Sequence, residues 1–503
     1  MSGFHNGLTA AILGALAVAC AQPPTPEPLP APATPPVGVA VDTPRARSFD
    51  RTKPPELPAL GRLTLPPVTR RQLDNGLEIL VVEHHELPLV DMILVVKTGG
   101  EGDPPRKPGV ATLTASMLDE GAGRRSALDI ADQEAFLGVR VGTGSGWDQS
   151  NVSLHAPVAV LDSAMALFAD VALRPTFPTS DLERLRKERL TELLQLKDRA
   201  PQIADRAYAA ILYGERHPYG RPLTGTEAST RAITRADVQR FYQTYFRPNN
   251  ATLVVVGDVT ADDVERRVRA LFGSWARGTI PPTPFAEPPA GLATAIYLID
   301  KPGAPQSSVR IGSIGVPRST EDYFSILVMN TILGGAFTSR LNNNLRETHG
   351  YTYGAGSGFA MRRSAGPFTA RAEVVGAKSD SSLIEFMKEL RAIRDAVPPA
   401  ELEKAKRYLQ LQLPGEFETT GDIASQLIPV VVHGLPLDYY NSYVQRIEDV
   451  TVTDVQRVAG EYVDPSKFAV VVVGDRKAIE AGLRALNIGE LSIRDITGQP
   501  VRR

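Results

Sequence analysis

The sequence is almost free of cysteine, which excludes two kinds of structure. Cys20 is the single cysteine among 503 residues, so neither an internal disulfide nor a cysteine-based zinc cluster can form. An excess of one charge sign is also lacking, because the formal net charge is -2 and no long run of like charges occurs. Since phosphate binding requires concentrated positive charge, we expect no nucleic-acid partner. The 43% of hydrophobic and 22% of charged residues are typical of a globular protein long enough for more than one core.

The N-terminus has an apolar run, but the run is short. Residues 8–19 are fewer than the about 20 residues that cross a bilayer, and they suit the core of a signal peptide. The tetrapeptide that ends at Cys20, Ala-Val-Ala-Cys, resembles a bacterial lipobox, although no Lys or Arg precedes the run and Ala17 stands where leucine is usual. We therefore expect a signal peptide and lipobox at residues 1–20, with Cys20 as the lipid attachment site. An ordinary secretory signal is the alternative.

Residues 21–60 are rich in proline and cannot build a core, because such segments favour extended polyproline conformations. Behind a lipid anchor, this segment would be a tether that holds the folded part away from a membrane; a merely disordered tail is the other interpretation. We expect an exported protein of a bacterial periplasm that is anchored to a membrane through its N-terminus, and we favour the outer membrane over the inner one.

Two stretches of the remaining chain are alike. The first contains Thr-Arg-Ala-Asp-Val-Gln-Arg, then Tyr-Phe-Arg-Pro-Asn-Asn and a valine run that ends in Gly-Asp, and the second repeats this order with related residues. The offset from Asp237 to Asp454 and the offset from Gly257 to Gly474 are the same, 217 residues. Because this period is far too long for a solenoid, it predicts two similar domains in tandem. We place them at residues 61–279 and 293–490, with a proline-rich linker at 280–292 and a tail at 491–503.

The order of the predicted elements indicates the fold class. Strands at 77–83 and 89–98 come early, and helices such as 181–196, with leucines at helical spacing, follow. The valine runs suit strands that are buried on both faces or against helices. Because strands precede helices without strict alternation, we predict α+β domains, each a sandwich in which helices pack on one face of a sheet. Further helices are expected at 237–245, 262–271 and 478–486.

Several segments resemble the pitrilysin/insulinase family of zinc metallopeptidases, in its two-domain class, over about residues 65–490. These segments are 219–227, 245–250, 333–341 and 345–353, together with the valine-rich strand before Asp258. In that family, a helix carries two zinc-binding histidines and a catalytic glutamate. Residues 109–121 keep the frame of this helix, but Thr112, Ala115 and Ser116 stand at the three positions. A zinc site needs imidazole or thiolate ligands, and a metal-bound water needs a carboxylate to take its proton, so we expect no metal in this chain.

The first domain offers little evidence for another metal site or for a catalytic nucleophile. Glu192 lies where the family has its third zinc ligand, but a surface or hydrogen-bonded carboxylate is the simpler interpretation of a glutamate without companions. His84 and His85 are adjacent on an expected strand, so they point to opposite faces and cannot chelate one ion without a turn. Ser116 or Thr112 would need a histidine or lysine base to act as a nucleophile, and none is near in sequence.

The second domain keeps a pair of hydrogen-bond donors, Arg346 and Tyr353, which are seven residues apart. The resemblance implies that these residues face the zinc across a chamber and bind the backbone carbonyl of the substrate near the scissile bond. A guanidinium and a phenol can both stabilise an oxyanion as it develops. The structural alternative is that Arg346 bridges a carboxylate near Glu347 and that Tyr353 caps a core. Tyr351 is a weaker candidate.

A chain with these donors and no zinc resembles one clam-shell half of a bacterial two-chain peptidase. The resemblance implies a non-catalytic subunit that supplies Arg346 and Tyr353 in trans to a zinc-bearing paralogous subunit, for the hydrolysis of short or unfolded peptides. We do not expect the chain to be active alone. The alternative is a structural scaffold of the same fold. Relatives add the substrate as a strand to a sheet edge, and residues 139–148 occupy the corresponding place here, although their glycines suit a plain hairpin equally well.

Overall fold

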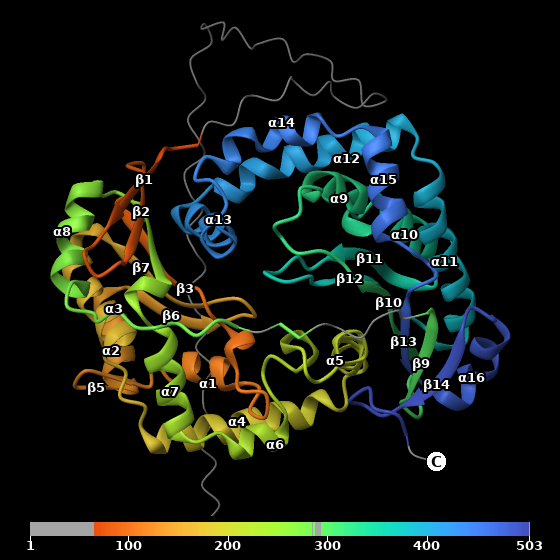
Figure 1. Cartoon of the computed structure of the whole chain (residues 1–503), viewed down its shortest axis with the longest axis horizontal. Coiled ribbons are helices and arrows are strands. Elements are labelled where there is room, and N and C mark those ends of the chain that lie inside the picture. Colours follow the sequence, from red (N-terminus) through yellow and green to blue (C-terminus); the bar gives the residue numbers. More distant parts are fainter. Residues whose placement is uncertain (1–64, 284, 287–292, 502–503) are drawn as a thin grey trace, which may run out of the picture. The chain divides into compact units, whose positions relative to one another are not determined.

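The computed structural model describes residues 65–283, 285–286 and 293–501 (Figure 1). The predicted signal peptide, the lipid attachment site Cys20 and the predicted tether lie outside the described residues, as does part of the predicted linker.

The first domain is built on a six-stranded sheet whose central strand is the first valine run. Every residue of this strand, β8, is buried, as expected for a strand covered on both faces. Strand β8 pairs with β2 in parallel and with β3 in antiparallel orientation, and the other pairings are antiparallel. The order across the sheet is β1 (Val68–Gln72), β2 (Glu78–Glu83), β8 (Ala251–Gly257), β3 (Leu89–Val96), β7 (Ser150–Pro157) and β6 (Arg140–Ser145).

The second domain repeats this sheet. The second valine run, β13, is again buried at every residue and lies third from one edge, as β8 does. The order is β14 (Glu490–Arg494), β9 (Ala295–Asp300), β13 (Ala469–Gly474), β10 (Gln306–Ile314), β12 (Pro367–Val375) and β11 (Thr352–Phe359). The two tandem α+β domains predicted from the repeat are therefore confirmed.

The repeat also explains how the equivalent helices α7 and α15 begin. Thr234 and Thr451 each accept a hydrogen bond from the backbone N–H three residues on, at Asp237 and Asp454, whose carboxylates accept bonds in return. Such capping boxes satisfy backbone donors that a helix start leaves free. The helices of the first domain are α1 (Val110–Ser116), α2 (Ala127–Leu137), α3 (Leu161–Leu173), α4 (Thr179–Leu196), α5 (Ala200–Tyr213), α6 (Glu227–Ala232), α7 (Arg235–Tyr245) and α8 (Ala261–Phe272).

The second domain contains both α-helices and π-helical turns. They are α9 (Tyr323–Asn330), the π-helical turn η5 (Thr331–Gly335), α10 (Arg340–Asn342), the π-helical turn η6 (Asn343–Thr348), α11 (Ser379–Asp395), α12 (Pro399–Gln412), α13 (Thr420–His433), α14 (Tyr443–Glu448), α15 (Val452–Tyr462) and α16 (Arg476–Ala485). The stretch from Tyr323 to Thr348 is apolar and long enough to cross a membrane by length and composition, but 56% of its most apolar window is buried inside the fold.

Helices of its own domain pack on one face of each sheet, and a helix of the other domain covers the opposite face. One face of the first sheet packs on helices of its own domain. On the other face, Leu80, Val95 and Val254 contact Ile423 and Leu427 of α13, a helix of the second domain (Figure 1). In the same way, α5 of the first domain packs on β10 and β13 of the second. This exchange was not predictable from the sequence, because periodicity shows that a helix has an apolar face but not which sheet it packs against.

The second domain extends beyond residue 490, where the sequence analysis ended it. Strand β14 (Glu490–Arg494) pairs in parallel with β9 and so belongs to the sheet. Its five residues alternate weakly and are only partly buried, so they give no strong strand signal in the sequence.

Candidate functional site

Helix α1 holds the three positions at which the zinc residues are replaced, and two glycines fix its start. Gly109 adopts a φ of 93°, and a Cβ there would lie 2.8 Å from the backbone oxygen of Thr224. Gly225 adopts a φ of 83°, and a Cβ there would lie 2.4 Å from the backbone oxygen of Pro108. At each glycine, two loops contact each other more closely than a residue with a side chain would allow.

A buried carboxylate anchors the same helix. The oxygens of Asp103 accept hydrogen bonds from the backbone N–H groups of Gly109 at 2.6 Å and Ala111 at 2.7 Å. Burial raises the pKa of Asp103 to about 7, while these two bonds and the nearby Arg221 and Arg189 act against the rise. The start of the helix is thus held by the Asp103 carboxylate, and this contact involves no metal.

The hydroxyl groups on α1 are occupied by local hydrogen bonds. Thr112 Oγ1 donates to the carbonyl of Gly109 at 3.1 Å, and Ser116 Oγ donates to the carbonyl of Thr112 at 3.0 Å. Ala115 is buried. Within the described residues, neither hydroxyl has a histidine or lysine partner, so the geometry offers no activated nucleophile.

A positively charged arginine, Arg189, lies beside the α1 positions at which related peptidases bind their metal ion. Arg189 of α4 donates from Nη1 to Thr112 Oγ1 and to the carbonyl of Gly109, both at 3.0 Å. Burial lowers the pKa of the Arg189 guanidinium, while the carboxylates of Glu192 and Asp103 oppose this shift. The position of Arg189 at this site was not predictable from the sequence, because nothing in a leucine-rich helix distinguishes one arginine among several.

The residues at this position do not fit a zinc ion. Thr112, Ala115 and Ser116 provide no imidazole, thiolate or carboxylate, and the Arg189 guanidinium would repel a cation. Glu192 is solvent-exposed, as expected for a surface carboxylate. In the part of the chain that the structure describes, no three His, Cys, Asp or Glu side chains lie close enough to hold an ion.

The two histidines after β2 have separate environments, which agrees with the view that they do not act as a chelating pair. His85 Nδ1 lies 2.7 Å from Asp258 Oδ1, and this contact raises the pKa of the exposed His85. His84 Nδ1 is buried and has no hydrogen-bond partner in the described part of the chain.

Arg346 lies in η6 with much of its donor capacity free. Its Nε is 3.5 Å from Glu347 Oε1, and its guanidinium carbon lies 4.6 Å from the centre of the Phe337 ring. The side chain remains 35% exposed and Phe337 is 65% exposed. A long contact to the next residue is a weak surface ion pair, so the arginine remains available to a partner or substrate.

Tyr353 is presented by an irregularity in the edge strand β11. The pairing with β12 shifts between Thr352 and Ala355, so Tyr353 and Gly354 lie in a bulge. The bulge is held by Thr352, whose hydroxyl donates to the carbonyl of Glu373 at 2.7 Å. Tyr353 is 90% exposed, which excludes the alternative that it caps a core. Bulges commonly redirect a side chain next to functional sites.

The two donors belong to neighbouring elements, because η6 packs against β11. The π-helical turn η5 also approaches β11 closely: a Cβ on Gly334 would lie 2.2 Å from the backbone nitrogen of Ser357. Gly334 is therefore required for the contact that supports the strand bearing Tyr353. Tyr351, the weaker candidate, instead stacks on His349 with ring centres 5.0 Å apart.

The segment 139–148 contains β6, the edge strand of the first sheet. Its last residues serve the fold: the buried Asp148 accepts hydrogen bonds from the Tyr219 hydroxyl at 2.7 Å and from the backbone N–H of Arg363 at 2.8 Å. The strand itself leaves one side of its backbone without a neighbouring strand among the described residues, as a peptide-binding edge requires.

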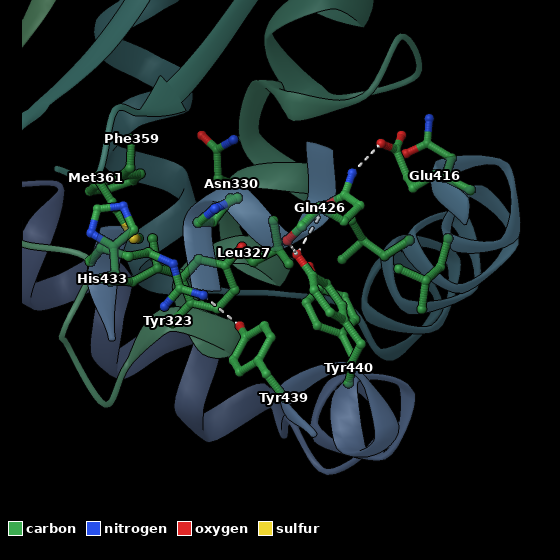
Figure 2. Close-up of a pocket in the computed structure, with 17 residues that line it drawn as sticks. Tyr323, Leu327, Asn330, Phe359, Met361, Glu416, Gln426, His433, Tyr439 and Tyr440 are labelled. Carbon is green, nitrogen blue, oxygen red and sulfur yellow. Dashed lines mark hydrogen bonds between the residues drawn. The ribbon is translucent and has the colours of Figure 1, made fainter. Parts of the chain in front are cut away.

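A cavity that the sequence analysis did not foresee lies in the second domain (Figure 2). Its volume is about 460 Å³, and Tyr323, Tyr439, Tyr440 and Tyr443 line it. Arg318 donates to the Tyr439 hydroxyl at 2.6 Å and lies 3.5 Å from the centre of the Tyr323 ring. The hydroxyl of Tyr440 contacts Gln426, which in turn donates to Glu416 (Figure 2). These bonds satisfy much of the polar lining internally.

Comparison with protein families and known proteins places this geometry in context. Residues 79–227 match the family model described as insulinase (peptidase family M16), and residues 232–409 match the model of the peptidase M16 inactive domain. An uncharacterized zinc protease of Mycobacterium leprae is 26% identical over 83% of this chain and 95% of its own length. The uncharacterized zinc protease YmxG of Bacillus subtilis is 23% identical over 78% of this chain and 94% of its own length.

Solved structures agree with the fold. A peptidase M16 inactive domain from Pseudomonas fluorescens has a TM-score of 0.76 and 29% identity, and the match covers 81% of this chain and 98% of that one. A protease from Helicobacter pylori has a TM-score of 0.75 at 21% identity, with 81% and 100% covered.

Proposed function

Because this chain belongs to the insulinase-type M16 peptidase family, we propose that it is a zinc-free subunit that lends Arg346 and Tyr353 to a zinc-bearing paralogous chain. The substrate class is short or unfolded peptides. The zinc belongs to the partner, and the contribution of this chain is to bind and polarise the substrate carbonyl.

The exposure of Tyr353 is the observation that carries this proposal. A tyrosine that is 90% exposed on a bulged edge strand contributes little to its own fold, and the hydroxyl is free to donate to a ligand. Arg346 on the adjacent turn is similarly available. Donors that are already oriented toward a developing oxyanion stabilise the transition state without having to reorganise.

The residues at and around α1 support the assignment of the zinc to the partner chain. Arg189 places a positive charge against Thr112, so this chain is unsuited to hold the metal itself. A scaffold of the same fold is the alternative function. It explains the lost ligands equally well, but it assigns no role to the exposed tyrosine or the adjacent arginine.

A reconstitution experiment tests the proposal. This chain and a zinc-bearing paralogue from the same organism are purified separately and mixed with an unstructured fluorogenic peptide. We expect cleavage by the mixture and by neither chain alone. Arg346→Ala or Tyr353→Phe should lower the rate about hundredfold or more, as loss of one oxyanion donor does in other enzymes. Arg391→Ala, at an exposed arginine of α11, is the matched control and should leave the rate unchanged.

The complex must be shown to persist in each mixture by size-exclusion chromatography. Full activity of an intact complex that contains Arg346→Ala would support the scaffold. Absence of cleavage in every mixture would overturn the proposal.

A further inference from the structure

A second cavity adjoins the lost metal position and has an unusual charge. Its volume is about 350 Å³, and its lining comes from α4, α5, the loop around Leu223, Trp147, and two residues of the second domain, Arg362 and Ile496. Leu223 also contributes the carbonyl that lies 3.4 Å from Thr112 Oγ1, so the cavity and the altered α1 position share a wall.

Three arginines line this cavity without an acceptor. Within the described residues, the side chains of Arg206, Arg221 and Arg362 make no hydrogen bond and no ion pair. Arg221 is only 8% exposed, and its Nη1 is a buried donor without a partner. Buried guanidinium groups are normally paired, because an uncompensated buried charge is costly. Arg221 is buried and Arg206 and Arg362 are half-buried, so the three groups together make this cavity favourable for an anion.

Carboxylates lie near the three arginines, namely Asp103 near Arg221, Glu227 and Asp495 near Arg206, and Asp148 near Arg362, but within the described residues none of them is bonded to these guanidinium groups. Asp205 lines the cavity but its carboxylate bonds to Arg310 Nε at 2.5 Å, and Lys197 is already paired with Glu227. Burial lowers the pKa of Arg206, Arg221 and Arg362, and the nearby carboxylates oppose this shift without reversing it.

Arg362 is held in place by aromatic rings rather than by acceptors. Its guanidinium carbon lies 4.6 Å from the ring centres of both Trp147 and Tyr219. Stacking on ring faces fixes the plane of the group and leaves its N–H edge available, which is the geometry that suits bidentate binding of a carboxylate.

Part of the wall is apolar. Leu193, Leu196, Ile203, Leu223 and Ile496 form this part, while Gln202 and Thr224 add polar groups to the lining. An inorganic anion gains nothing from such a wall, whereas a carboxylate attached to an apolar side chain uses both parts of the cavity.

We propose that this cavity binds the C-terminal carboxylate of a peptide whose last residue is apolar, with Arg206, Arg221 and Arg362 as the anion-binding groups. That the ligand is a peptide rests on the proposed function; the anion site stands on the cavity alone. The site uses no residue of the Arg346 and Tyr353 pair, and binding to it requires no partner chain.

The test uses the full chain by itself. An N-terminally labelled hexapeptide that ends in leucine is titrated by fluorescence anisotropy, once with a free carboxylate and once with a C-terminal amide. We expect the free acid to bind at least tenfold more tightly than the amide. Arg206→Gln should remove this preference, and Arg391→Gln on α11 should retain it.

Several results would overturn the site. The first is equal binding of the free acid and the amide, and the second is an unchanged preference for the acid in Arg206→Gln. The third is displacement of the labelled peptide by inorganic phosphate at the same concentration as by a carboxylic acid that has no apolar group. Because Arg221 is buried, Arg221→Gln is informative only if its thermal unfolding matches that of the wild type; Arg206 is half-buried, and its replacement avoids this ambiguity. If the chain alone binds no peptide but its mixture with the zinc-bearing paralogue still cleaves the substrate, this site is refuted and the proposed function stands.

Discussion

Arg189 should block metal binding even after the ligands on α1 are restored. Thr112→His and Ser116→His place two imidazoles at i and i+4 on one helix face, and Glu192 on α4 is the third potential ligand. In this double variant, the guanidinium that now lies 3.0 Å from Thr112 Oγ1 would stand beside the ion. We therefore expect weak zinc binding until Arg189→Gln is added.

The size of the effect follows from Coulomb's law. A unit charge about 5 Å from a divalent ion, at an effective dielectric constant of about 20, costs about 7 kcal/mol. Arg189 is only half-buried and its side chain can rotate away, which reduces this cost. An affinity difference of about hundredfold between the double and the triple variant, or about 3 kcal/mol, is the conservative expectation.

Competition with a fluorescent zinc chelator at pH 7.5 measures both affinities. Lys187→Gln in the double-histidine background is the control, because it removes an exposed positive charge from the same helix away from Thr112. Thermal unfolding verifies that each variant is folded. Equal zinc affinity with and without Arg189 would refute the reasoning. The absence of ligands on α1 would then be sufficient to explain why the site does not fit zinc.

Two further predictions concern stability. Burial lowers the pKa of His217 to about 4, so the unfolded chain takes up this proton first as the pH falls below 6.5, and the fold loses stability there. His217→Asn should narrow the difference in unfolding free energy between pH 7 and pH 5 by up to about 2 kcal/mol in urea titrations; an unchanged difference would contradict this. Gly334→Ala should cost about 1–3 kcal/mol, because its Cβ would meet Ser357, and a wild-type melting temperature would argue against that contact.

Local patterns predicted the elements well. The valine runs became β8 and β13, buried throughout, because a strand covered on both faces needs apolar residues at every position. The helix expected at 181–196 begins two residues earlier, at Thr179, and ends at Leu196 as predicted. Helix periodicity and strand hydrophobicity are properties of neighbouring residues, so a single sequence carries them.

Long-range contacts were not predictable from the same patterns. Arg189 reaches Thr112 across 77 residues of sequence, and Arg206, Arg221 and Arg362 meet in one cavity from separate segments. An arginine on a helix surface looks the same in sequence whether it faces solvent or a cavity. The functional role of Arg346 and Tyr353 is still a prediction, although the structure removes the alternative of a core-capping tyrosine.

The α1 helix and the exposed donors Arg346 and Tyr353 differ in their structural importance to the fold. Gly109 and Asp103 maintain the helix through contacts with the loop and with its own backbone, so the frame survives as part of the fold after the ligands are gone. No such structural reason applies to Tyr353, whose ring contributes little buried area. The exposure of Tyr353 on this bulge supports the proposal that the residue serves a second chain or a substrate.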